Sequence, residues 1–303
     1  METSSAIEPM GEGGNVSRPL VTFWFYGFVL LVGATMAQPQ DIATTNLRKS
    51  TEDGFTRYVQ ATEVRINKEL ARSGTFLYLD GLPEPRRSEA RATLKRGEVY
   101  MEQLSTLDVS GRPLTAPDGL IHHWMGAVSI PGATVAQVLA LAQDYDHHQD
   151  YYKPEVVRSR LVSRKGNDFK IFYRVRKKKV ITVTLNTDHD VHYFPLSSLR
   201  AYSRSYSTRI AQVDNADKPD ERERPIGQDS GFMWRLNSYW RFDAREGGVY
   251  VECESISLTR DMPAALAWLI KPFITGIPKE SLHMTMSSTR SAVLARMGAA
   301  SRP

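Results

Sequence analysis

The sequence predicts an α+β fold in which a curved antiparallel sheet of about six to seven strands is closed by a long C-terminal helix. Strand-like alternation recurs between residues 121 and 258 without long helical segments between the strands, which favours an antiparallel meander over a doubly wound sheet. Two small helices are expected between the first and the second strand, and the chain ends in an amphipathic helical segment.

Composition sets the first limits on function. The chain has 303 residues, of which 41% are hydrophobic, and a formal net charge of +5. Its single cysteine, Cys253, excludes an internal disulfide and a multi-cysteine metal site. The positive balance suits an anionic partner such as a membrane surface. No RNP-type aromatic motif, zinc-finger spacing or long basic helix indicates nucleic-acid binding, so no nucleic-acid partner is predicted.

The amino terminus reads as an export signal. Residues 20–34 form the only long apolar run, and the small residues Thr35 and Ala37 after it suit signal peptidase. We therefore predict a signal peptide over 1–37 and an exported protein, periplasmic or extracellular. The alternative is a membrane anchor, although the run is shorter than the ~20 apolar residues that a spanning helix needs.

Residues 38–118 predict a helical N-terminal extension with an accessory strand. Phe55, Val59 and Ile66 recur on one face of a helix over Thr51–Ala71. The remaining expected elements of the extension are an extended segment over Phe76–Gly81, a surface helix over Arg86–Arg96 and the accessory strand over Glu98–Leu104.

The main domain is predicted over 119–298, followed by a tail over 299–303. Its first strand ends at Pro131, because proline has no amide for the ladder, and Thr134 can cap the small helix that follows. A tyrosine-rich turn ending at Pro154 leads into the second strand, Val156–Val162. Small helices inserted at this place leave a gap in the sheet that can admit a ligand.

The rest of the domain alternates strands and turns. The loop Asp214–Asp229 is charged and is expected in solvent, and Pro272 and Pro278 are expected to break the chain before a last helix over Lys279–Met297. The further strands are expected over Phe169–Arg176, Ile181–Val191, Ala201–Val213, Trp234–Phe242 and Val249–Leu258.

One stretch resembles a known family. The run VSIPGATVAQVL at 128–139, with Asp144-Tyr-Asp and YKPEVV at 152–157, resembles the opening of the START-like superfamily, also called the polyketide cyclase and lipid-transport or SRPBCC helix-grip fold. The resemblance spans Ile121 to Met297. It implies a deep apolar pocket for sterols, phospholipids, polyketides or plant hormones, and a minority of members are cyclases or hydroxylase components. The family has no universal catalytic motif to carry over.

A pocket of this kind is lined by aromatic and apolar walls with a few polar groups. Strand parity and the position of the insertion predict its lining, although large aromatic side chains also fill ordinary cores. The predicted pocket residues are Trp124, Tyr145, Tyr152, Tyr173, Trp234, Ser238, Trp240, Leu282 and Met286.

For an enzyme on this fold, the candidate acid–base groups are two carboxylates or a tyrosine of the pocket. Glu252 and Glu254 fall on one side of their strand, about 7 Å apart, and can serve acid–base chemistry if they are buried. The alternative is ion pairing with Arg235 or Arg241 on a neighbouring strand.

The strand pair around residue 178 carries a basic cluster. It is either a solvated hairpin tip or a docking point for anionic headgroups. The cluster comprises Arg174, Arg176, Lys177, Lys178 and Lys179.

These observations favour a binding protein that holds a hydrophobic small molecule or lipid in an internal cavity. The alternatives are a cyclase- or dehydratase-type enzyme on the same fold, or an envelope interaction module with a filled cavity. No nucleophile elbow or phosphate loop is present, and no cofactor is predicted. His147 and His148 point about 100° apart on a helix, so no metal site is predicted. The oligomeric state stays open.

Overall fold

The computed structural model describes residues 44–72, 74–179, 181–261 and 264–300, with the side chains of 264–275 and 300 left out. The predicted signal peptide over 1–37 lies outside the described residues. The helices are α1 (Lys49–Ala71), η2 (Tyr78–Gly81), α2 (Arg86–Lys95), α3 (Val135–Ala142), η3 (Tyr145–His147), α4 (His148–Tyr151) and α5 (Ala264–Ala300). The strands are β1 (Thr45–Asn46), β2 (Tyr100–Gln103), β3 (Gly119–Pro131), β4 (Val156–Lys165), β5 (Asp168–Lys178), β6 (Thr182–Pro195), β7 (Arg200–Asp214), β8 (Arg222–Glu223), β9 (Gln228–Asp229), β10 (Arg235–Arg245) and β11 (Gly248–Arg260).

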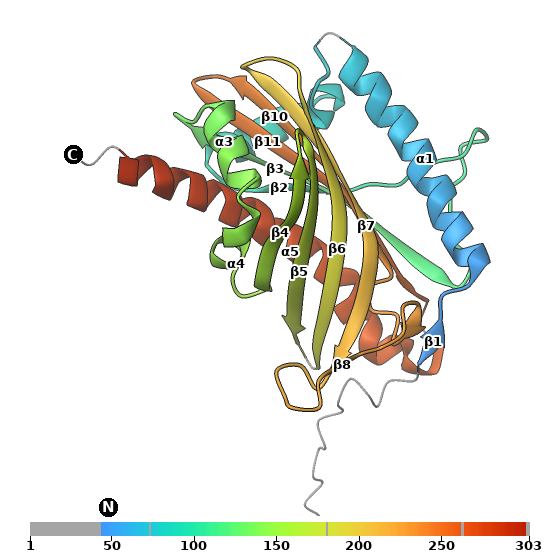
Figure 1. The fold of residues 1–303 in the computed structure, drawn as a ribbon. Helices are drawn as coiled ribbons and strands as arrows, with labels where there is room; N and C mark the ends of the chain where they lie inside the picture. The colour runs from blue at the N-terminus through green and yellow to red at the C-terminus, as the bar shows by residue number, and fades with distance from the viewer. Residues whose placement is uncertain (1–43, 73, 180, 262–263, 301–303) are drawn as a thin grey trace, which may run out of the picture. The chain divides into compact units, whose positions relative to one another are not determined.

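One antiparallel sheet carries the fold (Figure 1). Its strands follow the order β2-β3-β11-β10-β7-β6-β5-β4, with β8 paired to β7, while β1 and β9 pair separately. Seven of these strands, β3 to β7 with β10 and β11, have 10 to 15 residues, and β2 is the short accessory strand expected before them. The predicted fold class, an antiparallel sheet with a long C-terminal helix, is therefore confirmed.

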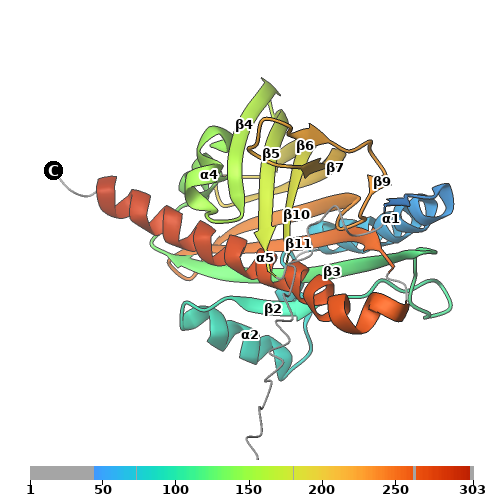
Figure 2. The ribbon, with the colours of Figure 1, turned by 90° about the horizontal axis from the view of Figure 1, so that it is seen from below.

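Helix α5 lies across one face of the sheet, which we call the α5 face (Figure 2). Its buried side chains Leu282, Met286 and Val293 pack against this face. The helix approaches Gly126 of β3 closely, since an added Cβ atom there would lie 3.0 Å from the Met286 Cγ atom. Glycine at this position lets the helix rest directly on the strand.

The N-terminal extension covers the opposite face, which we call the α1 face. Phe55 and Ile66 of α1 pack against Ile256 and Leu258 of β11. Leu94 of α2 joins a neighbouring apolar cluster on the same face. Each strand of this region therefore buries both of its faces, one against α5 or the space below it and one against the extension.

The insertion between β3 and β4 has the strand end and the helix cap that the sequence predicts. The Thr134 hydroxyl caps α3 by accepting a hydrogen bond from the Gln137 amide, and the Gln137 side chain returns a contact to Thr134. The first strand ends at Pro131, as expected. The insertion thus places Tyr145 and Tyr152 beside the α5 face.

Two expected features are wrong. The segment predicted to be extended at Phe76–Gly81 contains η2 instead, because the amides of Tyr78 and Leu79 turn toward the Glu252 carboxylate rather than a strand. Pro272 and Pro278 do not end the helix, since α5 continues from Ala264 to Ala300. A proline removes one intrahelical hydrogen bond, and the packing of the following turns holds the helix.

In the described parts of the chain, no helix has the length and apolar character to cross a membrane.

Candidate functional site

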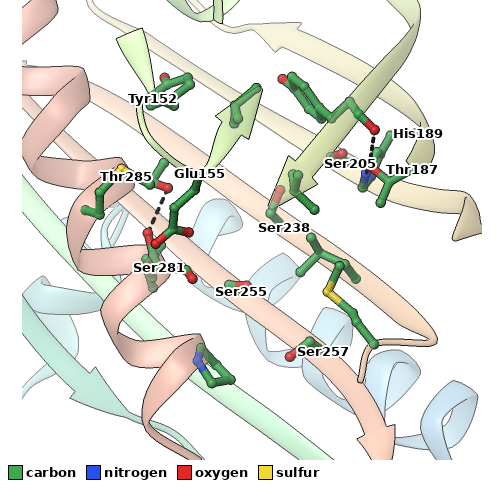
Figure 3. A pocket seen from close by; sticks show the side chains of 18 of the residues that line it. Tyr152, Glu155, Thr187, His189, Ser205, Ser238, Ser255, Ser257, Ser281 and Thr285 are labelled. Atoms are coloured by element: carbon green, nitrogen blue, oxygen red, sulfur yellow. Dashed lines mark hydrogen bonds between the residues drawn. The ribbon is translucent and has the colours of Figure 1, made fainter. Parts of the chain in front are cut away.

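A cavity of about 670 Å³ lies between the sheet and α5 (Figure 3). Its walls come from the α5 face of the strands β4 to β7, β10 and β11, from the insertion, and from α5 itself. Most of its wall is apolar, including Ile171, Val175, Val183, Leu185, Leu236 and Leu282. A space of this size is in the range of sites that enclose a small organic ligand.

Paired tyrosines form one end of the cavity. The Tyr193 hydroxyl donates to the Ala142 carbonyl oxygen at 3.0 Å, so the Tyr145 hydroxyl donates to Tyr193 across 2.7 Å. Burial raises the pKa of Tyr145 well above its usual value. Both phenols therefore stay neutral, and their protons are bound within the protein.

His148 holds a third tyrosine at the same end. Its Nε2 atom lies 3.2 Å from the Leu141 carbonyl oxygen, which can only accept a hydrogen bond, so Nε2 carries the proton. The Nδ1 atom then accepts from the Tyr173 hydroxyl at 2.7 Å. Burial lowers the pKa of His148 to about 4, and the ring is neutral at pH 7.

Two hydroxyl groups of α5 that line the cavity, those of Thr285 and Thr289, are bound to the helix itself. Thr289 Oγ1 donates to the Thr285 carbonyl oxygen at 2.8 Å, and Thr285 Oγ1 donates to the Ser281 carbonyl oxygen at 2.9 Å (Figure 3). Tyr152 then donates to Thr289 across 3.1 Å. These groups line the cavity, but their protons have acceptors in the protein.

The hydroxyl groups of a row of serines on the sheet, which we call the serine row, have no such acceptors in the part of the protein that the structure describes. Ser238 of β10 stands directly opposite Ser205 of β7 on one side and Ser255 of β11 on the other. Ser203 and Ser257 extend the row, and all five residues line the cavity. None of their hydroxyl groups has a hydrogen-bond partner among the residues that the structure describes. The sheet therefore presents free hydroxyl groups to the cavity.

Ion pairs cross the rim of the cavity, near the turn between β5 and β6. Lys177 contacts the Glu155 carboxylate, and its Nζ atom donates to the Ser281 hydroxyl at 3.0 Å. Lys179 Nζ lies 2.7 Å from Glu280 Oε2. These contacts join the turn to α5 and to the loop after α4.

Six of the nine predicted pocket residues line the cavity, and three do not. Trp124 is on the α5 face but lies below the helix, with Lys279 Nζ 5.4 Å from its ring centroid. Met286 is fully buried against Gly126. Trp234 precedes β10 and packs on the α1 face, where its Nε1 atom donates to Asp229 at 3.0 Å. The residues on the cavity wall are Tyr145, Tyr152, Tyr173, Ser238, Trp240 and Leu282.

The two candidate catalytic carboxylates are on the α1 face and cannot reach the cavity. Both are 1% exposed, and the Nη atoms of Arg241 lie 3.5 Å from Glu252 and 3.9 Å from Glu254. Burial raises the pKa of Glu252 to about 7. Burial also opposes ionisation of Glu254, but the hydrogen bond from His123 and the charges of Arg65 and Arg241 outweigh it and lower its pKa to about 2. The expected pairing with Arg241 is present, although it is buried rather than exposed.

The basic cluster is not a free hairpin tip. Arg174 is 5% exposed, and its guanidinium donates to both carboxylate oxygens of Glu221 at 2.6 and 3.0 Å. Arg176 pairs with Asp217. Both acids lie in the charged loop before β9, which was expected in solvent, and the two lysines of the rim are paired as described above. Lys178 has no ion pair among the described residues. Docking on an anionic membrane stays a prediction.

The sequence did not predict the serine row. Serines alternate with tyrosines and an arginine along β7, so neither face of that strand is clearly apolar in the sequence. The run from Ser255 to Thr259 on β11 shows the same alternation of hydroxyl and aliphatic side chains. Hydroxyl groups at every second position of β7 and β11, the two strands that flank β10, were the available signal. No group of three or more His, Cys, Asp or Glu side chains in the described ranges is arranged to hold a metal ion.

A scan against models of protein families finds no match, and a search of curated proteins finds no relative. Solved structures are similar to the chain. A STAR-related lipid transfer protein from Xanthomonas axonopodis has 14% identity and a TM-score of 0.41, covering 63% of this chain and 98% of that chain. Human STARD10 has 10% identity and a TM-score of 0.40, covering 71% and 84%. The Zhui aromatase/cyclase from a Streptomyces species has 10% identity and a TM-score of 0.39, covering 61% and 100%.

The fold itself is defined by the chain's own topology. Two small helices, α3 and α4, follow the first long strand, the other six long strands form an antiparallel sheet with it, and α5 closes one face over a cavity. This arrangement of an antiparallel sheet and a closing C-terminal helix is a helix-grip fold.

Proposed function

We propose that the protein binds a hydrophobic small molecule or a lipid in the cavity under α5. The observation that carries the proposal is the space of about 670 Å³ with a mostly apolar wall. Close packing is the normal state of a protein interior, and a void of this size costs stability unless it serves a ligand. The paired tyrosines and the serine row supply the polar groups that orient a guest.

The geometry favours binding over catalysis. Glu252 and Glu254, the carboxylates on which the cyclase or dehydratase alternative depended, face away from the cavity. The tyrosines of the wall donate their protons to protein acceptors, and burial raises the pKa of Tyr152 to about 12. These phenols are poor acids and bases at pH 7. An interaction module with a filled interior is also disfavoured by the cavity.

Binding is tested by titrating a fluorescent hydrophobic dye into the purified protein and by native mass spectrometry of protein from its own host. The variant Ser238→Trp places an indole in the middle of the cavity, and we expect it to weaken dye binding at least tenfold. Ser163→Trp, on the exposed part of β4, is the matched control and should bind as wild type. If no dye binds and no molecule co-purifies, the proposal is wrong.

We further propose that the protein is exported, with a membrane-anchored form as the alternative. The apolar run at 20–34 and the small residues after it support this. N-terminal sequencing of the protein recovered outside the cytoplasm tests the point. A new terminus near residue 38 would support export with cleavage, while an intact terminus in the membrane fraction would support the anchor.

A further inference from the structure

We infer that the ligand is an apolar molecule that carries several hydroxyl or carbonyl oxygens along one edge and no charge where it is buried. The inference rests on the proposed function and specifies the class of ligand. It is carried by the serine row on the sheet and by one histidine beside it.

The serine row presents free hydrogen-bonding groups at regular spacing. Ser205, Ser238 and Ser255 lie on three adjacent strands, so their hydroxyl groups follow one another at the separation between strands, about 4.8 Å. Ser203 is 2% exposed, Ser205 8% and Ser257 5%, and their hydroxyl groups have no partner among the described residues. A hydrocarbon guest would exclude water from these groups and leave them unpaired, which is unfavourable.

His189 is an independent observation on a different strand. It is 5% exposed, lines the cavity from β6, and lies near Ser205 (Figure 3). Its Nε2 atom is bonded to Thr187 Oγ1 at 3.1 Å, whereas Nδ1 has no partner in the described residues. Burial lowers the pKa of His189 to about 4, so the imidazole is neutral at pH 7. A buried neutral imidazole with one free nitrogen suits a ligand oxygen or hydroxyl.

The opposite wall defines the other edge of the ligand. Leu282 and Met284 on α5 are apolar. Of the helix hydroxyl groups that line the cavity, Thr285 and Thr289 donate to helix carbonyl oxygens, and Ser281 accepts from Lys177 Nζ at the rim. The ligand therefore needs hydrogen-bonding groups on the edge that faces the sheet and not on the edge that faces the helix.

Charge is confined to the rim. The charged residues on the cavity wall are Glu155, Arg176, Lys177 and Lys179, and each is in an ion pair. A buried ligand charge would find no free partner further in, and an unpaired buried charge is strongly disfavoured. The buried part of the ligand is therefore neutral.

The test compares neutral probes that share a frame and differ in oxygen content. Progesterone has two ketone oxygens, and cortisol adds three hydroxyl groups to the same frame; methyl stearate and methyl 9,10-dihydroxystearate form an acyclic pair. Affinities are measured by displacement of the fluorescent dye and by calorimetry. Hydrophobicity alone favours the member with fewer oxygens in each pair. We expect wild type to prefer the oxygen-rich member of at least one pair by about tenfold, the effect of one or two satisfied buried hydrogen bonds.

The triple variant Ser205→Ala/Ser238→Ala/Ser255→Ala should lose that preference while it still binds the dye, which shows that it is folded. Val183→Ala, which removes apolar wall and no hydroxyl group, is the matched control and should weaken both members of a pair equally. If the dye binds but wild type prefers the oxygen-rich member in neither pair, or if the triple variant keeps the preference, the inference is overturned and the proposed function stands. If the dye itself does not bind, both fail.

Discussion

The two faces of the sheet bury polar side chains in opposite ways. On the α1 face, Glu252 accepts from two backbone amides and Glu254 from His123, and Arg241 lies between them. On the α5 face, the serine hydroxyl groups are buried without protein partners beside an open space. Buried polar groups with partners stabilise one arrangement of the chain, whereas those without partners need an external one. The comparison separates a structural region from a binding region within the same strands.

The largest expected effect is on the α1 face. Arg241→Met leaves Glu252 and Glu254 buried without their shared cation, and we expect a loss of about 3–5 kcal/mol in the free energy of unfolding. Urea denaturation followed by circular dichroism measures it. Lys170→Met is the control, because the side chains of Lys170 and its partner Asp190 are 64% and 51% exposed and an exposed pair contributes about 0–1 kcal/mol. Equal effects of the two substitutions would break the contrast between the faces.

Low pH should reduce the stability of the fold through buried neutral histidines on the α5 face. Burial lowers the pKa of His122, His148 and His189 from 6.5 to about 4. The unfolded chain therefore binds protons first, and stability is present above pH 6.5 and lost as the pH falls toward 4. Glu252 acts in the opposite direction between pH 7 and 4.5, since burial raises its pKa from 4.5 to about 7 and the folded state takes up the proton.

The balance predicts a net loss of stability from pH 7.5 to pH 4.5, because the three buried histidines outweigh the opposing effects of Glu252 and of the exposed His147, whose pKa is raised by its hydrogen bond to Asp144. In His189→Gln one of these titrations is absent, and the loss over that interval should shrink by about 3 kcal/mol. Urea denaturation at the two pH values measures both. A variant with the same pH dependence as wild type would show that His189 is not buried as a neutral ring.

A smaller effect compares single hydroxyl groups on the two faces. Thr62 of α1 is fully buried, and its Oγ1 atom donates to the Tyr58 carbonyl oxygen at 3.0 Å and contacts Thr106 Oγ1 at 2.6 Å. Thr62→Val should cost about 1–3 kcal/mol, because Thr106 loses its partner. Ser238→Ala breaks no hydrogen bond and should leave the free energy of unfolding within about 0.5 kcal/mol of wild type. The reverse order would contradict the assignment of the serine row to ligand contact.

At the rim, the expected effect on stability is also small. Glu280→Gln removes the ion pair with Lys179, and both side chains are at least 38% exposed, so the free energy of unfolding should change by less than about 1 kcal/mol. Dye release, followed by stopped-flow fluorescence, should nevertheless be several-fold faster than in wild type. Unchanged release would show that this pair does not hold the rim.

The sequence predicted the elements well because their signals are local. Proline at 131, the cap at Thr134 and the two-residue alternation of the strands each act over a few residues. Strand parity also placed Tyr173, Ser238 and Trp240 correctly on the cavity wall. It failed at Trp234, because parity gives a face only within a strand and this residue precedes β10. The burial of Glu252 and the pairing of Arg174 depend on segments far away in the sequence, which no local pattern contains.

The contacts of α5 differ along its two sides. Toward β3 the helix rests on Gly126 through close-packed side chains, and toward the β5–β6 turn it is held by Lys177 and Lys179. The first contact is apolar and does not depend on ionic strength, whereas the second is electrostatic and is screened by salt. Raising the ionic strength should weaken the contacts of Lys177 and Lys179 and leave the packing on Gly126 intact. Ligand exchange should therefore accelerate with salt, while the free energy of unfolding stays nearly unchanged.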